Sequence, residues 1–293
     1  MKKEEIKIVF SDIDGTLIND KDELPHNFIE MVETLEAKDI TFVAASGRSA
    51  HSIYEKLNYH NDNLYVVSDN GAVILHDGEI IKVNAFLRED FTRIIKEFQA
   101  LSNTTIACAT AHKSYVQPYA EDQDLDFIRE YYPSFDIVDD LSELDGEFVS
   151  ISVHSHNETD QNYHSKQMNY LKENHTIVRA GEKWIDAIPP NTNKGYALES
   201  LAELLGHSAD NAIAFGDFNN DIQMLSTAKI GFAMEDATEQ VKAVADYVIG
   251  SNNDNSVIRK IYELLEIDKW KSATINSIIF EGFSSSSLSL ATP

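Results

Sequence analysis

The chain has 293 residues, of which 43% are hydrophobic, enough for about two globular domains with ordinary apolar cores. Its 49 Asp and Glu residues outnumber 24 Lys and Arg residues, which gives a net charge of -25. A chain with this much negative charge repels nucleic acid and anionic membrane surfaces. The sequence therefore predicts neither as a partner. An anionic substrate would need a local positive site.

The cysteine content and the start of the chain indicate the compartment. Cys108 is the single cysteine, which excludes an internal disulfide and fits a reducing environment. The first apolar run stops at Asp12, too early for a signal peptide or a membrane span. We therefore expect a cytoplasmic protein. Its oligomeric state is not indicated by the sequence.

The first part of the chain alternates apolar runs with amphipathic stretches. Short buried strands that alternate with helices predict a parallel sheet covered on both faces. The signals are strand-like runs at 6–10, 40–46 and 64–74, a helix opened by Pro25, a helix at about 49–57, and a hairpin turn at 76–78.

The pattern changes from about residue 85. Apolar residues at helical spacing predict an amphipathic helix that carries Phe91, Ile94, Ile95, Phe98 and Leu101. Strand-like segments interleaved with polar helical stretches then indicate an open-faced α+β unit. These segments lie at 104–110, 114–118, 147–154 and 175–180.

From Lys194 the first pattern resumes, with helices and apolar strands in alternation up to a last helix at about 253–265. We therefore predict an α/β fold, a Rossmann-like doubly wound parallel sheet core interrupted by an inserted α+β cap domain. The expected core is 1–84 and 187–268, and the expected cap is 85–186. The serine-rich segment 269–293 is expected to be a mobile tail.

Polar residues follow the predicted core strands, where the ligands of open α/β sheets bind. They are Asp12-Ile13-Asp14-Gly15-Thr16, Ser46-Gly47-Arg48, Lys194 at a helix start, and the stretch 216–221 with Asp217 and Asp221. In extended geometry Asp12 and Asp14 point the same way. Two carboxylates about 4 Å apart repel by roughly 4 kcal/mol at an effective dielectric near 20, so a cation is expected beside them.

Carboxylate oxygens together with a substrate phosphate suit Mg²⁺. A phosphate at the same place would also meet Lys194, Ser46 and backbone N–H groups. A carboxylate there can act as the nucleophile and form an aspartyl-phosphate, while a neighbouring Asp protonates the leaving oxygen and then deprotonates a water.

In combination, these four motifs resemble those of the haloacid dehalogenase-like hydrolases, specifically the Cof-type phosphatases with a type IIB cap inserted between the second and third motifs. The resemblance covers roughly residues 5 to 268. It implies a Mg²⁺-dependent phosphatase acting on a small phosphorylated metabolite. The expected substrates are a sugar phosphate or a cofactor phosphate such as pyridoxal or flavin phosphate.

The resemblance also implies residue roles, with Asp12 as the nucleophile and Asp14 as the general acid and base. Asn220 would orient Lys194 or metal waters, and Arg48 would bind a substrate anion or a cap residue. The implied phosphate- and substrate-binding residues are Ser46, Gly47, Arg48, Lys194, Asn220 and Asn70, and the implied metal ligands are Asp12, Asp14 through its backbone carbonyl, Asp217 and Asp221. The sequence departs from the usual pattern at Glu235-Asp236, where relatives have Gly-Asn, and at Asn255, where glycine is common.

Other functions fit part of the pattern. A phosphomutase would use the same aspartyl-phosphate but return the phosphate to the substrate. A receiver-like regulator is disfavoured by the inserted cap and by an acceptor that follows the first strand. A silent phosphate-binding regulator with the same fold is disfavoured because no motif residue is missing. A calcium loop would need other residues at the positions of Thr16 and Glu23.

Several of these residues also have purely structural interpretations. Residues 217–221 and Ser46 are suited to cap helices, and Arg48 could pair with a surface carboxylate. A cation at a helix start is unfavourable, which favours a functional role for Lys194. His154 and His156 share one strand face as an exposed or cap-lining pair, and Trp184 is either packing or a platform for substrate.

Overall fold

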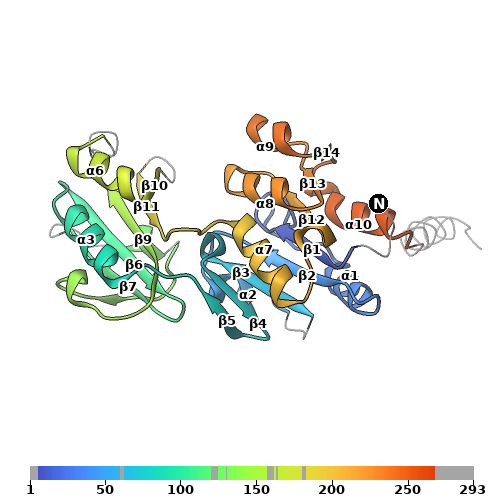
Figure 1. Cartoon of the computed structure of the whole chain (residues 1–293), viewed down its shortest axis with the longest axis horizontal. Coiled ribbons are helices and arrows are strands. Elements are labelled where there is room, and N and C mark those ends of the chain that lie inside the picture. Colours follow the sequence, from blue (N-terminus) through green and yellow to red (C-terminus); the bar gives the residue numbers. More distant parts are fainter. Residues whose placement is uncertain are drawn as a thin grey trace, which may run out of the picture.

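The computed structural model describes residues 6–59, 63–119, 125–129, 131–156, 162, 164–179 and 183–267. It has two lobes, each built around its own sheet (Figure 1). The strands of the second sheet all lie between two segments of the chain that together form the first sheet. The predicted tail, 269–293, lies outside the described residues.

The first lobe contains an eight-stranded sheet in the order β14-β13-β12-β1-β2-β3-β4-β5. Its pairs from β14 to β3 are parallel, and β4 and β5 add two antiparallel strands at one edge. Apolar runs buried on both faces explain the central strands. The strands are β1 Ile8–Asp12, β2 Thr41–Ala45, β3 Leu64–Ser68, β4 Val73–His76, β5 Glu79–Val83, β12 Ala212–Gly216, β13 Ile230–Ala233 and β14 Tyr247–Val248.

Helices pack on this sheet through their apolar residues, such as Phe28, Met31, Val32 and Leu35 of α1. They are α1 Phe28–Glu36, α2 Ala50–Leu57, α7 Lys194–Leu204, α8 Ile222–Thr227, α9 Glu239–Val244 and α10 Ser256–Leu264. Short 3₁₀ turns join them at η2 Asp69–Gly71, η4 Ala209–Asn211, η5 Asn219–Asp221 and η6 Asn252–Asp254.

The structure corrects three of the predicted elements. The run 64–74 is two antiparallel strands, because Asp69, Asn70 and Gly71 all have positive φ and reverse the chain. The helix predicted from Pro25 begins at Phe28, after a turn in which the Phe28 N–H donates to the Pro25 carbonyl. The last helix begins at Ser256 because residues 252–254 form a separate 3₁₀ turn.

The second lobe contains a six-stranded sheet in the order β10-β11-β9-β6-β7-β8, antiparallel except for β7 with β8. Helices α3 and α6 pack against each other and lie on its far side from the first lobe (Figure 1). The strands are β6 Thr104–Thr110, β7 Ser114–Gln117, β8 Asp136–Ile137, β9 Phe148–Ser155, β10 Thr176–Arg179 and β11 Trp184–Ile188. The helices are α3 Arg88–Gln99, α4 Asp126–Arg129, η3 Leu141–Glu143 and α6 Lys166–Asn174.

Each lobe has its own apolar core. The largest cluster surrounds the first sheet. In the second lobe, one cluster joins α3 and α6 to the sheet through residues such as Phe91, Phe98 and Ile151, and a smaller cluster contains Val116 and Ile128. The ends of β1, β2 and β12 face a pocket that the second lobe also lines. Within the described residues, none of the helices is both long and apolar enough to cross a membrane.

Candidate active site

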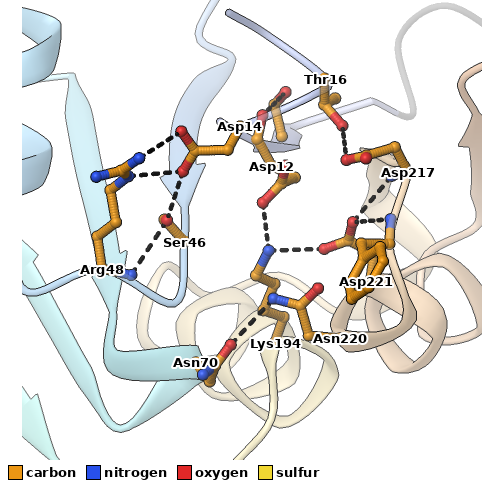
Figure 2. A network of polar contacts seen from close by, with 12 residues as sticks. Asp12, Asp14, Thr16, Ser46, Arg48, Asn70, Lys194, Asp217, Asn220 and Asp221 are labelled. Atoms are coloured by element: carbon orange, nitrogen blue, oxygen red, sulfur yellow. Dashed lines mark hydrogen bonds and ion pairs between the residues drawn. The ribbon is translucent and has the colours of Figure 1, made fainter. Parts of the chain in front are cut away.

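A buried lysine joins two of the four motifs. Lys194 is the first residue of α7, and its side chain is fully buried. Its ammonium donates to Asp12 Oδ1 at the end of β1 and to Asp221 Oδ1 at 2.6 Å (Figure 2). The charges of Asp12 and Asp221 outweigh burial and raise the pKa of Lys194, so the amine is protonated at neutral pH. A cation at this helix start is therefore stabilised by the carboxylates that face it.

The loop after β12 holds Asp221 in a fixed position. Asp221 Oδ2 accepts from the backbone N–H groups of Asp217 and Phe218, at 2.9 and 3.0 Å. A side chain at Gly216 would place its Cβ 2.5 Å from the Cβ of Asp221, so only glycine allows this close approach. The Thr16 hydroxyl donates to Asp217 Oδ1 at 2.8 Å and ties this loop to the motif after β1.

Three carboxylates converge beside Lys194. One oxygen from each of Asp12, Asp217 and Asp221 lies within 4.8 Å of the others. Burial raises the pKa of Asp12 well above its ordinary value, and the charge of Asp221 adds to this effect, while Lys194 opposes it. Burial also raises the pKa of Asp217. This group of hard oxygen donors is suited to a divalent cation.

Asp14 lies in the same site but does not contact Lys194. Its carboxylate accepts from Arg48 Nε at 2.8 Å and from Arg48 Nη2 at 3.0 Å, and more weakly from the Ser46 hydroxyl at 3.4 Å (Figure 2). Burial acts to raise the pKa of Asp14, but the hydrogen bonds and charge of Arg48 outweigh it and the pKa is lowered. Arg48 was predicted to bind a substrate anion or a cap residue. Its partner in this structure is Asp14, and the contact with a substrate anion stays a prediction.

The remaining predicted residues form the wall between β2 and α7. Asn220 Nδ2 donates to Asn70 Oδ1 at 3.0 Å, so its direct partner is Asn70 rather than Lys194. A Cβ at Gly47 would lie 3.1 Å from Asn70 Oδ1, which explains why a residue without a side chain stands there.

Asn255 has a φ of 55°, the left-handed conformation for which glycine is common and asparagine is tolerated.

A pocket of about 660 Å³ lies over these residues and between the two lobes. This volume is typical of a site for a small metabolite. The first lobe lines it with Asp12, Asp14, Ser46, Arg48, Asn70 and Asp217, all predicted from the sequence. The structure thus brings together residues that lie up to 209 positions apart, from Asp12 to Asp221.

A family model described as haloacid dehalogenase-like hydrolase matches residues 9–261. The chain belongs to this family. It is a haloacid dehalogenase-like hydrolase. We call the lobe built on the eight-stranded sheet the core and the lobe built on the six-stranded sheet the cap.

Several curated relatives of this hydrolase are named as phosphatases. Two are named 5-amino-6-(5-phospho-D-ribitylamino)uracil phosphatase. YbjI of Escherichia coli is 26% identical over 262 residues, 89% of this chain and 97% of the relative. YcsE of Bacillus subtilis is 24% identical over 260 residues, 88% of this chain and 95% of the relative. A solved HAD subclass IIB sugar phosphatase shares the fold, with a TM-score of 0.70 and 23% identity over 88% of this chain and 99% of that one.

Sequence reasoning missed the part of the hydrolase pocket that the cap supplies. Tyr132, Ser150, Ser152 and Asp186 line it, and Asp69 lines it from the core. The available signal was the alternation of side chains between the two faces of a strand. It places Ser150 and Ser152 on one face of β9, and Trp184 and Asp186 on one face of β11. Trp184, for which packing and a platform were both open, lines the pocket and also packs against Tyr131 and His154.

Proposed function

We propose that this hydrolase removes phosphate from a small phosphorylated metabolite, a sugar phosphate or a cofactor phosphate such as pyridoxal or flavin phosphate, with the help of Mg²⁺. The observation that carries the proposal is the position of Asp12, which lies at the base of the pocket among Asp217, Asp221 and Lys194. The names of the two ribitylaminouracil phosphatases support a substrate of this size.

The donor set fits the proposed metal. Asp12 and Asp217 would be its side-chain ligands, with the backbone carbonyl of Asp14 beside them. Asp221 is the least available of the three converging carboxylates, because one oxygen binds Lys194 and the other binds two N–H groups. When bound, Mg²⁺ would neutralise charge on these carboxylates and on the substrate phosphate.

In the first proposed step, a carboxylate oxygen of Asp12 attacks phosphorus. A bond forms between Asp12 and phosphorus while the bond from phosphorus to the ester oxygen breaks, which leaves an aspartyl-phosphate. Asp14, in its protonated form, gives its proton to the departing ester oxygen. To do so, the protonated oxygen must exchange its hydrogen bond with Arg48 for one to the substrate, while the other oxygen keeps its bond to Arg48.

In the second step, the carboxylate of Asp14 takes a proton from a water molecule, and the water oxygen attacks phosphorus. The bond between phosphorus and Asp12 breaks, so phosphate leaves and both aspartates return to their starting forms. Lys194 and Ser46 would hold the oxygens of the transferring phosphate. Gly47, Asn70 and Asn220 would shape the wall beside it, and Arg48 would position Asp14.

The cap supplies the rest of the proposed function. With the divisions proposed from the sequence, 85–186 would close on the core formed by 1–84 and 187–268, exclude bulk water and contact the leaving group. A cytoplasmic location remains part of the proposal. It is supported by Cys108, which is a free, buried thiol.

The test is phosphate release from sugar, nucleotide and cofactor phosphates, with Mg²⁺ or with excess chelator. Asp12→Asn should lower release by about a thousandfold or more, because it removes the nucleophile. Asp210→Asn, an exposed change at the Lys229 ion pair, is the matched control. Equal activity in chelator would refute the metal, and an isomerised ester without free phosphate would indicate a mutase.

A further inference from the structure

The cap wall of the pocket has a regular polar face. Strands β9 and β11 are antiparallel neighbours, and their register places Asp186 directly opposite Ser152. Ser150 is two residues before Ser152 on the same face of β9, and Trp184 is two before Asp186 on β11. All four residues line the pocket. The wall therefore offers two hydroxyls, one carboxylate and one indole to a bound molecule.

The Asp186 carboxylate and the Ser150 hydroxyl on this face can each form further hydrogen bonds. Tyr132 Oη and Ser152 Oγ are 3.0 Å apart, and Asp186 faces Ser152 across the strand pair. A carboxylate can accept about four hydrogen bonds, so Asp186 can bind further donors from the pocket side. Ser150 Oγ is buried and has no hydrogen-bond partner among the described residues. A buried hydroxyl without a partner is costly, so a ligand that bonds to it would be stabilised.

Two acidic residues lie at this end of the pocket, and burial raises the pKa of Asp186 to about 6 and the pKa of Asp69 to about 7. Asp186 from the cap and Asp69 from the core both line it, and both add to burial in raising the pKa of the Tyr132 hydroxyl between them. The one basic residue in the described lining is Arg48, whose guanidinium is bound to Asp14. Residues 120–124, 130, 157–161, 163 and 180–182 of the cap contain no Lys or Arg in the sequence.

An aromatic surface lies beside the carboxylate. Trp184 contacts the ring of Tyr131, with ring centroids 5.1 Å apart at 64°. Both residues line the pocket, and the Tyr131 side chain is exposed. Aromatic faces bind the apolar face of a sugar or a heterocycle and are attracted to cations.

We propose that this pocket selects monoesters whose leaving group bears hydroxyl or amino donors and no negative charge, with Asp186 as the specificity-determining residue. This inference rests on the proposed function and names the class of leaving group. Above about pH 6, an anionic leaving group would face the Asp186 carboxylate without a free cation among the described lining residues. An amine would gain a charge-assisted hydrogen bond to Asp186.

Two matched pairs of probes test the charge rule. Glucitol 6-phosphate and gluconate 6-phosphate differ in a terminal hydroxymethyl or carboxylate group. Glucose 6-phosphate and glucosamine 6-phosphate differ in a hydroxyl or ammonium group. We expect kcat/KM for the gluconate ester to be lower than for the glucitol ester by about tenfold or more, and the glucosamine ester to be preferred over the glucose ester by about threefold or more.

The decisive variant is Asp186→Asn, which keeps the shape and removes the charge. It should lower the ratio of kcat/KM for the glucitol ester to kcat/KM for the gluconate ester by about tenfold. It should also remove the preference for glucosamine 6-phosphate over glucose 6-phosphate. The matched control is Asp136→Asn on β8 of the same lobe, where the carboxylate pairs with Lys113 and is largely exposed. The control should leave both ratios unchanged.

Binding of the same four esters to the Asp12→Asn protein, measured by calorimetry, keeps the test independent of turnover. If no ester is hydrolysed by the wild-type protein, the proposed function fails, and the binding ranks still decide the charge rule. Equal binding and turnover of the gluconate and glucitol esters would overturn the inference. The inference would also be overturned if the kcat/KM ratios within the two probe pairs were the same in Asp186→Asn as in the wild-type protein.

Discussion

Arg48 binds the carboxylate of Asp14 through two hydrogen bonds, from Nε at 2.8 Å and from Nη2 at 3.0 Å. This forked contact fixes both oxygens of the proposed general acid and base, which a single ammonium group cannot do. Lys56 is also near, with Nζ 3.8 Å from Asp14 Oδ1, but it forms a closer ion pair with Asp22. Arg48 is therefore the residue that sets the orientation of Asp14.

The first prediction follows from this geometry. Arg48→Lys should lower kcat by about tenfold with little change in KM, almost as much as Arg48→Ala, because Lys keeps the charge and loses the fork. Lys56→Ala should change kcat by less than about threefold. Steady-state kinetics on the best ester would measure these values. Full activity in Arg48→Lys would mean that charge alone is sufficient at this position.

The second prediction concerns the stability of the buried Lys194. Lys194→Met would leave Asp12 and Asp221 together without their shared cation, at a cost of about 3–5 kcal/mol in the free energy of unfolding. Because the two carboxylates raise the pKa of Lys194 above its ordinary 10.5, its contribution is fully present at pH 7 and is lost only above about pH 10.5.

Urea unfolding at pH 7 would measure this cost, with Lys229→Met as the control. Lys229 makes an exposed ion pair with Asp210, and its loss should change stability by less than about 0.5 kcal/mol. Saturating Mg²⁺ should restore part of the lost stability in Lys194→Met, because a ligand that binds only the folded state stabilises it. A cost equal to that of the control would contradict a structural role for the buried ion pair.

The third prediction compares two glycines with positive φ. Gly71 has a φ of 101°, and a Cβ there would lie 2.4 Å from the carbonyl oxygen of Asn193, directly before Lys194. Gly78 has a φ of 77° and open space around it. Gly78→Ala should cost about 1–2 kcal/mol from backbone strain alone, and Gly71→Ala about 1–3 kcal/mol more from the clash.

Gly71→Ala should also lower kcat/KM, because relief of the clash moves the start of α7 and with it Lys194. A shift of about 1 Å at a catalytic group can cost about a hundredfold in rate. Gly78→Ala should keep wild-type kinetics. Equal losses of stability in the two variants, measured by urea unfolding, would show that the packing of the 69–71 turn on α7 is loose.

Three of the four motifs were predictable because each follows an apolar strand of the parallel sheet, and parallel strands bring their carboxyl ends to one edge. Lys194 was predictable because a cation at a helix start is unfavourable without a partner. The partners of these residues were not predictable. Alternation along a strand predicted that Asp12 and Asp14 point the same way, but β1 ends at Asp12. Asp14 lies in the following turn and binds Arg48, while Asp12 binds Lys194. The local pattern predicts which residues follow a strand. The side-chain partner of each residue depends on where the strand ends.

The cap wall was missed for a different reason. Ser152 and Asp186 are 34 positions apart, and single polar residues in apolar strands are usual on solvent-facing surfaces. Only the register between β9 and β11 brings them together, and only the position of the cap over the core turns that face into a pocket wall. Asp69 was overlooked beside Asn70, because only the three-dimensional structure places it in the lining of the same pocket.

The last prediction uses the buried carboxyl of Asp69. Burial raises the pKa of Asp69 to about 7, against the lowering effect of the Ser68 hydroxyl, which donates to it at 2.8 Å. The folded protein therefore binds more protons than the unfolded chain between about pH 4 and pH 7, and stability from this group falls as pH rises through that window. Asp69→Asn removes the titration and suits the φ of 50° at this position.

The variant should match the wild-type protein near pH 4 and be more stable by about 1–3 kcal/mol at pH 8, below the full value of the shift because Asp69 is partly exposed. Asp77→Asn is the control, since Asp77 has a φ of 49° but lies exposed in the β4–β5 turn. Urea unfolding at pH 4, 6 and 8 would give the difference in the free energy of unfolding between the variant and the wild-type protein at each pH. A gain that does not change with pH would mean that the amide stabilises the fold by packing, and that the carboxyl of Asp69 is ionised throughout this range.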